Sequence, residues 1–171
     1  AAYHLKKPVK YALHRMEDMR MTGKRHPYSS DFKIGLNKDL KIVAYEATFY
    51  QNAGAAADLS PAVMERTLFH CTNSYFVPNV KATAYSCRTH LPPNTAFRGF
   101  GGPQGIAAME SIIDRIARFL KKDAADVRKI NFYGLDSDNI THYGQEVELN
   151  RIHTIYEQLM TSSEYDKRRK E

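Results

Sequence analysis

The chain has 171 residues, the length of one ordinary domain, and 43% of them are hydrophobic, which is enough for a packed core. Its 25 Lys and Arg exceed its 19 Asp and Glu by six, with opposite charges interleaved. We therefore expect an anionic small molecule rather than a nucleic acid as partner. The apolar runs are too short for a membrane span. Cys71 and Cys87 are too few for a disulfide scaffold or a four-cysteine metal site.

The first part of the chain indicates strands. The apolar stretch Val9–Met16 suits a strand, which a loop ending at Gly23 follows. Two alternating stretches come next, Asp31–Leu36 and Val43–Phe49, joined by the turn residues Asn37–Asp39. Alternation with a period of two residues predicts a β-hairpin here.

A helix and a third strand follow the hairpin. The helix is predicted to run from Asp58 or Ser60, either of which can cap it, to about residue 70. Pro61 costs little in the first turn, where its missing N–H has no helical partner. The next strand is predicted over Val80–Arg88.

The second half is predicted to be helical. Apolar residues repeat every 3.6 positions in one long helix, at Ile106, Met109, Ile112, Ile113, Ile116 and Leu120. Asp123 can cap a short helix that Gly134 ends, and a last amphipathic helix covers Ile152–Leu159 after a polar loop over 136–145. A mixed sheet with packed helices makes residues 1–171 a single α+β domain.

The segment Thr95–Gly105 holds four glycines, two phenylalanines and one arginine. A glycine-rich turn that opens a helix gathers backbone N–H groups and partial positive charge, which suits a phosphate or another oxyanion. Arg98 adds a planar fork of donors, and glycines beside the Phe100 ring admit a flat ligand. The alternative is a tight structural loop in which Phe97 and Phe100 fill the core. The residues by themselves leave both interpretations open.

The amino-acid sequence of this loop resembles a motif of a known family. Residues Asn94–Gln104 are similar to the signature of the molybdenum-cofactor domain of the xanthine dehydrogenase and xanthine oxidase family. Further similar stretches occur in the same order as in that family, at Arg15–Met19, Gly23–Tyr28, Ser60 and Met64–His70. The resemblance runs from Ala1 past Tyr133 and fades toward the C-terminus. It implies an α+β molybdopterin-binding fold.

The resemblance also implies a reaction. The family hydroxylates purines such as xanthine and hypoxanthine with oxygen from water, and a molybdenum–pyranopterin cofactor receives two electrons that leave through iron–sulfur clusters and FAD. Arg66 matches the arginine that hydrogen-bonds the purine and stabilises charge developing on it. Phe100 matches the phenylalanine that packs against the flat substrate. Glu65 precedes Arg66 and can orient it.

Three loop residues match positions along the cofactor: Phe97, Arg98, whose backbone follows the cofactor, and Gly99. No residue is expected to bind the metal directly, because the histidines lack the spacing of metal ligands. Outside the resemblance, Arg66 would be read as a solvated cation and Phe100 as a core ring. Because both residues lie in matching motifs of the same family, the resemblance favours a substrate-binding role for Arg66 and for Phe100.

Two positions bear on the substrate. The related aldehyde oxidases tend to lack an arginine at position 66 and to carry a bulky residue at position 102, so Arg66 and Gly102 favour a purine. The family's general-base glutamate is expected downstream of Glu171. Glu146 and Glu148 match no motif for it.

The resemblance therefore implies one part of a longer cytoplasmic enzyme, whose iron–sulfur and FAD modules lie on other segments or subunits. The isolated chain is expected to be inactive and to self-associate through exposed apolar surface. The alternatives are an inactive remnant or interaction module, an aldehyde-oxidase-type hydroxylase, and a plain anion-binding module at the glycine loop.

Overall fold

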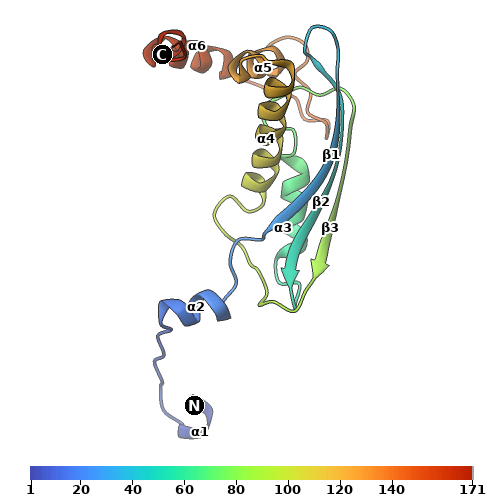
Figure 1. The fold of residues 1–171 in the computed structure, drawn as a ribbon. Helices are drawn as coiled ribbons and strands as arrows, with labels where there is room; N and C mark the ends of the chain where they lie inside the picture. The colour runs from blue at the N-terminus through green and yellow to red at the C-terminus, as the bar shows by residue number, and fades with distance from the viewer. Residues whose placement is uncertain (171) are drawn as a thin grey trace.

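The computed structural model describes residues 1–170. The elements of this part, in chain order, are α1 (Ala2–Leu5), α2 (Arg15–Met21), β1 (Tyr28–Leu36), β2 (Ile42–Gly54), α3 (Ser60–Phe69), β3 (Val80–Arg88), α4 (Gly102–Leu120), α5 (Ala124–Asn131), α6 (Ile152–Ser162) and α7 (Tyr165–Arg168). In Figure 1, α1 and α2 lie on an arm that leads away from the sheet, and the two ends of the chain lie at opposite ends of the molecule. Within residues 1–170, no helix has both the length and the apolar character needed to cross a membrane.

The three strands form one mixed sheet in the order β1-β2-β3. β1 and β2 form the antiparallel hairpin that the alternation predicts, with Tyr28 opposite Gln51 near one end. β2 and β3 run parallel, with Tyr50 opposite Tyr85, and α3 lies in the crossover that parallel strands require. The expected α+β architecture is therefore confirmed.

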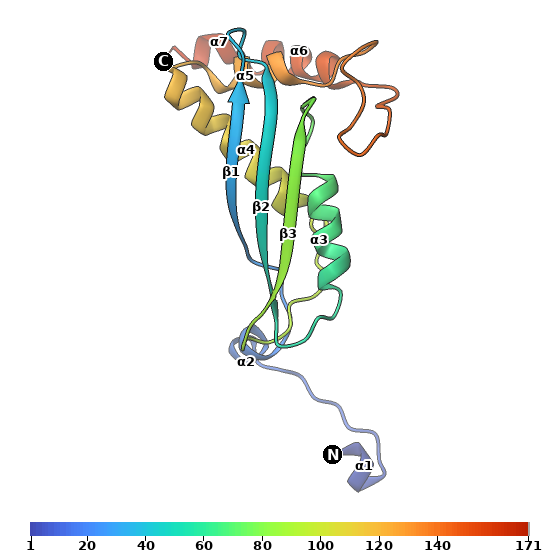
Figure 2. The ribbon, with the colours of Figure 1, turned by 90° about the vertical axis from the view of Figure 1, so that its right-hand side faces the viewer.

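Helices α3 and α4 cover one face of the sheet, as the two views in Figures 1 and 2 agree. The core between these layers is made of buried side chains from the sheet, the helices and the segment after α3: Ile42, Tyr45, Ala47, Phe49, Cys71, Tyr75, Val77, Met109, Ile112, Ile113, Ile116, Ala117 and Val127. The opposite face carries charged side chains and the exposed, stacked rings of Tyr50 and Tyr85. Lys81 donates to Glu46 across this face (2.8 Å), and the bond holds the pKa of the Glu46 carboxyl below its usual value.

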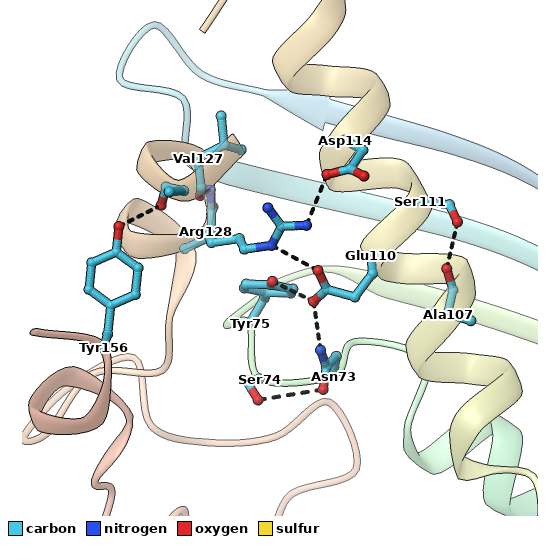
Figure 3. A network of polar contacts seen from close by, with 12 residues as sticks. Asn73, Ser74, Tyr75, Ala107, Glu110, Ser111, Asp114, Val127, Arg128 and Tyr156 are labelled. Atoms are coloured by element: carbon cyan, nitrogen blue, oxygen red, sulfur yellow. Dashed lines mark hydrogen bonds and ion pairs between the residues drawn. The ribbon is translucent and has the colours of Figure 1, made fainter. Parts of the chain in front are cut away.

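A network of charged and polar groups joins α4, α5 and the segment after α3 (Figure 3). The Arg128 guanidinium lies between two carboxylates of α4, with Nε 2.9 Å from Glu110 and Nη2 2.9 Å from Asp114. Glu110 also accepts hydrogen bonds from the Asn73 amide and the Tyr75 hydroxyl. Every charged group in this network therefore has a partner of opposite charge, which fixes α5 on α4.

The strand predicted over Val9–Met16 is wrong. Residues 6–14 form no regular element, and α2 begins at Arg15. Local bonds favour the helix, because the Glu17 carboxylate accepts from the His14 backbone N–H and Arg15 pairs with an aspartate one turn later. No strand lies beside residues 9–14 in the described chain, and the exposed Tyr11 shows that this segment has no core to face.

Some predicted helix boundaries also change. The long helix begins at Gly102 rather than Ile106, and α5 ends at Asn131 rather than at Gly134. Asp123 caps α5 as predicted, accepting from the Ala125 N–H at 2.8 Å. The predicted cap of α3 by Asp58 or Ser60 is wrong, since the residue before α3 is Leu59 and no side chain caps this helix. The Ser60 hydroxyl instead bonds to His26.

Candidate functional site

The glycine–phenylalanine loop forms a tight turn immediately before α4. Gly99, Phe100 and Gly101 have φ angles of 92°, 49° and 94°, three consecutive residues in the left-handed region. The turn is closed by two hydrogen bonds, from Phe100 N to the carbonyl of Phe97 (2.8 Å) and from Gly102 N to the carbonyl of Gly99 (3.0 Å). Two of the three left-handed residues are glycines, which adopt this conformation without steric cost, whereas Phe100 carries strain that its surroundings must offset.

The end of this loop packs backbone to backbone against α3. A Cβ atom added to Gly101 would lie 2.0 Å from the carbonyl oxygen of Val63, and one added to Gly105 would lie 2.6 Å from that of Thr67. The Thr67 hydroxyl donates to the Gly101 carbonyl (3.0 Å). Larger residues would separate the two elements, so the glycines hold the loop against the helix that carries Arg66.

The predicted site residues lie on the two elements that this junction joins, α3 and the loop. Glu65, Arg66, Arg98 and Gly99 are exposed. The Phe97 side chain is 53% exposed, so Phe97 does not fill the core, and Phe100 is half-buried. The alternative that Phe97 fills the core is therefore wrong.

Arg66 directly precedes Thr67, the residue that bonds to Gly101, and it is exposed whereas Thr67 is buried. Among residues 1–170, the side chains of Glu65, Arg66 and Arg98 take part in no ion pair. The exposed Arg98 cation lies in the loop that leads into α4, and together with the partial positive charge of the helix start it favours an anionic ligand. No hydrogen bond joins Glu65 to Arg66 in the described part of the chain, and the orienting role of Glu65 stays a prediction.

A segment that the sequence reasoning gave no role, Lys24–His26, lies behind the loop. Arg25 donates from Nη2 to the carbonyl of Arg98 (2.6 Å), and its guanidinium carbon lies 4.4 Å from the centre of the Phe97 ring. The His26 ring is only 2% exposed and lies 2.7 Å from the Ser60 hydroxyl at the start of α3. Burial lowers the pKa of His26, so the ring is neutral near pH 7.

Two sequence signals could have pointed to these contacts. Glycines four residues apart, at 101 and 105, are typical of a helix face that approaches another backbone closely. The Lys24–His26 run lies within a stretch that carries the family resemblance, yet its residues match no direct substrate contact. Supporting residues of this kind are identified only by the contacts that the fold creates.

A hollow of about 550 Å³ lies where β2 and β3 end and α3 begins, lined by Ala53–Ala57, Pro61, Ser86 and Arg88. None of the six predicted site residues lines this hollow. In residues 1–170, no group of three His, Cys, Asp or Glu side chains is placed to hold a metal ion.

Comparisons with known proteins identify the fold and the family. Residues 1–132 match the family model described as "Molybdopterin cofactor-binding domain". The chain is 44% identical over all 171 residues to the protein named "Xanthine dehydrogenase" of Drosophila subobscura, of which it covers 13%. Thus the chain spans about an eighth of the length of this relative.

Solved structures give the same fold. The aldehyde oxidoreductase of Desulfovibrio gigas aligns with a TM-score of 0.79 and 27% identity, over 87% of this chain and 16% of that one. The quinoline 2-oxidoreductase of Pseudomonas putida 86 aligns with a TM-score of 0.85 over 99% of this chain and 22% of that one, and at 20% identity it supports the fold alone.

Proposed function

The chain belongs to the molybdopterin cofactor-binding domain family, and we propose that it is part of a molybdenum hydroxylase of the xanthine dehydrogenase type. The proposed reaction replaces a ring C–H of a purine by C–OH with oxygen from water, releasing two electrons and two protons. The observation that carries the proposal is the junction of α3 and the glycine–phenylalanine loop, where the Thr67 hydroxyl donates to the Gly101 carbonyl and packs the helix that carries Arg66 against the loop that carries Arg98 and Phe100. The 44% identity to a xanthine dehydrogenase over the whole chain supports the purine.

The loop fits an anionic pterin cofactor in its charge and in its buried polar atoms. The Nη1 atom of Arg25 and the Oε1 atom of Gln104 are buried beside the loop and have no hydrogen-bond partner among the described residues. The exposed backbone of Arg98 and Gly99 is accessible next to the start of α4. We infer that Phe97, Arg98 and Gly99 would line the cofactor. A bound molybdenum–pyranopterin would supply the electron acceptor for the reaction.

On the substrate side, the residues of this chain bind and orient the purine. The Arg66 guanidinium can donate two hydrogen bonds to a ring oxygen or nitrogen and stabilise the negative charge that develops there. The Phe100 ring can pack against the flat purine face. Glu65, exposed on the same turn of α3, would restrict the positions of the arginine side chain. General-base catalysis, the iron–sulfur clusters and FAD are assigned to other segments or subunits, in a cytoplasmic enzyme.

Self-association is proposed on separate grounds. The N-terminal arm exposes large apolar side chains, namely Tyr3, Leu5, Val9, Tyr11, Met16, Met19 and Met21. Such a surface marks an interface, and in the isolated chain it would join copies of the protein to each other. Sedimentation velocity is expected to show oligomers that dissociate on dilution. A strictly monomeric species at high protein concentration would contradict this proposal.

An aldehyde is the second candidate substrate, because the Desulfovibrio gigas structure with the same fold is an aldehyde oxidoreductase. Arg66 separates the two candidates. A purine offers ring nitrogens and carbonyl oxygens to a guanidinium, whereas an aldehyde has a single carbonyl at the reacting carbon and needs no remote cation.

The proposal is tested by isolating the tagged protein from its own host and measuring molybdenum and co-purifying chains. Stoichiometric molybdenum with xanthine-dependent dye reduction is the expected result. A preparation that contains molybdenum but reduces dye only with aldehydes would favour the second candidate. A protein without molybdenum and without partners would contradict both.

A further inference from the structure

We propose that Arg25 is a positioning residue, whose guanidinium holds residues Phe97–Gly101 in the shape in which they meet the cofactor. That the loop meets a cofactor rests on the proposed function. That Arg25 fixes the shape of the loop does not depend on the proposed function. Arg25 lies outside the loop and far from it in sequence. It contacts the loop at the Phe97 ring and at the Arg98 carbonyl.

Two contacts of different kinds define this role. The face of the guanidinium lies over the Phe97 ring, with Cζ 4.4 Å from the ring centre, well inside the distance of about 6 Å at which a cation is attracted to an aromatic face. The edge of the same group donates from Nη2 to the carbonyl of Arg98 at 2.6 Å. A planar cation can stack and donate at the same time, and a lysine ammonium lacks this combination.

The contacts fall where the loop needs them. Arg98 directly precedes the three left-handed residues, so fixing its carbonyl fixes the entry to the strained turn. The second amino group, Nη1, is buried against the loop, 3.9 Å from the place that a Cβ of Gly99 would occupy. It donates to no described residue. Burying such a donor costs free energy, and only the contacts to the ring and the carbonyl offset it here.

The neighbours of Arg25 hold the two ends of the same loop. The Lys24 carbonyl accepts from the Thr95 N–H (3.1 Å), and the His26 carbonyl accepts from the Gln104 side chain (3.3 Å). Arg25 reaches the middle, between these two points. Three consecutive residues thus contact the loop at its start, its centre and its end.

The charge of Arg25 has a second consequence. It forms no ion pair with any carboxylate of residues 1–170. Its positive charge therefore has no counter-charge on the side of the loop that Arg25 contacts, and the exposed Arg98 side chain adds a second positive charge to the same loop. A cation behind the backbone favours an anionic group in front of it.

The test measures amide hydrogen exchange in the 171-residue chain without any cofactor. In Arg25→Met, exchange at Phe100 and Gly102, whose N–H groups close the turn, is expected to be about fivefold faster than in the wild type, while exchange in β2 is unchanged. Arg25→Lys, which keeps the cation and a donor but not the planar group that stacks and donates at once, should restore slow exchange only in part. Arg118→Met serves as the control, because Arg118 is exposed on α4 and away from the loop.

A second variant keeps Arg25 and removes its aromatic partner. Phe97→Leu is expected to speed exchange at the same two amides, and it guards against a misfolded Arg25 variant. Unchanged exchange in both variants would overturn the proposal. So would equal acceleration in β2, which would make Arg25 a general stabilising residue, and so would an Arg25→Lys variant as slow as the wild type, because the planar guanidinium would then not be required. Because no cofactor is involved, a lack of molybdenum in the wild type would overturn the proposed function and leave this result standing.

Discussion

Arg128 and Arg66 lie in two regions of the molecule that differ in how the arginine is paired. Arg128 is enclosed between Glu110 and Asp114, and its side chain is 28% exposed (Figure 3). Arg66 is exposed on α3 and pairs with no carboxylate of residues 1–170. The Arg128 guanidinium is paired with two carboxylates of the fold. The Arg66 guanidinium has no such partner among residues 1–170, so its hydrogen-bond donors are available to a ligand.

The difference teaches how an arginine that serves stability can be told from one that serves binding. A paired guanidinium contributes to the free energy of unfolding, because removing it leaves partly buried carboxylates without a counter-charge. An exposed, unpaired guanidinium contributes little to stability, so removing it should leave the free energy of unfolding almost unchanged. Substitutions in both regions and a pH titration can break or sharpen this comparison.

The largest effect is expected inside the second region, where the loop packs on α3. Gly101→Ala should lower the free energy of unfolding by roughly 2–4 kcal/mol, because the new Cβ meets the Val63 carbonyl and also forces an alanine into the left-handed region. Urea unfolding measures the change. Gly144→Ala is the matched control, since its φ is 87° and a Cβ there meets nothing within 4 Å, and it should cost only about 1 kcal/mol. Equal losses in both variants would contradict the packing argument.

A smaller effect is expected in the network. Arg128→Met should lower the free energy of unfolding by about 1–3 kcal/mol, less than for a fully buried pair because solvent reaches these groups. Arg66→Met should change it by no more than about 0.5 kcal/mol, as usual for an exposed residue. Equal stability of the two variants in chemical denaturation would remove the distinction between the regions.

The smallest effect is a pH dependence from His26. Because burial lowers its pKa in the folded state, the unfolded chain binds a proton first as the pH falls through about 6.5. His26 thus stabilises the fold fully above that pH, and this contribution is lost at up to about 1.4 kcal/mol per pH unit as the pH falls toward the folded-state pKa. Burial acts in the same direction on His142.

His26→Gln should therefore flatten the stability profile between pH 7 and 5, with the part due to His142 remaining. His90→Gln, a change at an exposed histidine, should leave the profile as it is. A profile in His26→Gln as steep as that of the wild type would show that His26 does not titrate in this range.

Elements with strong periodicity could be predicted from the sequence. The hairpin and the long helix α4 follow from alternation and from the 3.6-residue repeat, because each pattern matches one buried face. The family motifs also pointed to the loop and to Arg66. These predictions needed only local pattern or resemblance.

Features that depend on distant contacts could not be predicted. The stretch 9–16 is apolar enough for a strand, but strands need a partner, and the described chain offers none there. Ser60 suits a helix cap by type, yet a buried histidine 34 residues away takes its hydroxyl. Arg25 lies in a recognisable stretch, and only the folded chain brings it against Phe97.

The central claim is that the unpaired Arg66 serves the substrate and not the fold. The most direct measurement is kcat/KM for xanthine in the complete hydroxylase carrying Arg66→Met, with Arg118→Met in parallel. The account predicts a loss of roughly 10²–10³-fold for Arg66→Met with unchanged unfolding, and wild-type values for Arg118→Met. Full kcat/KM in Arg66→Met would contradict it.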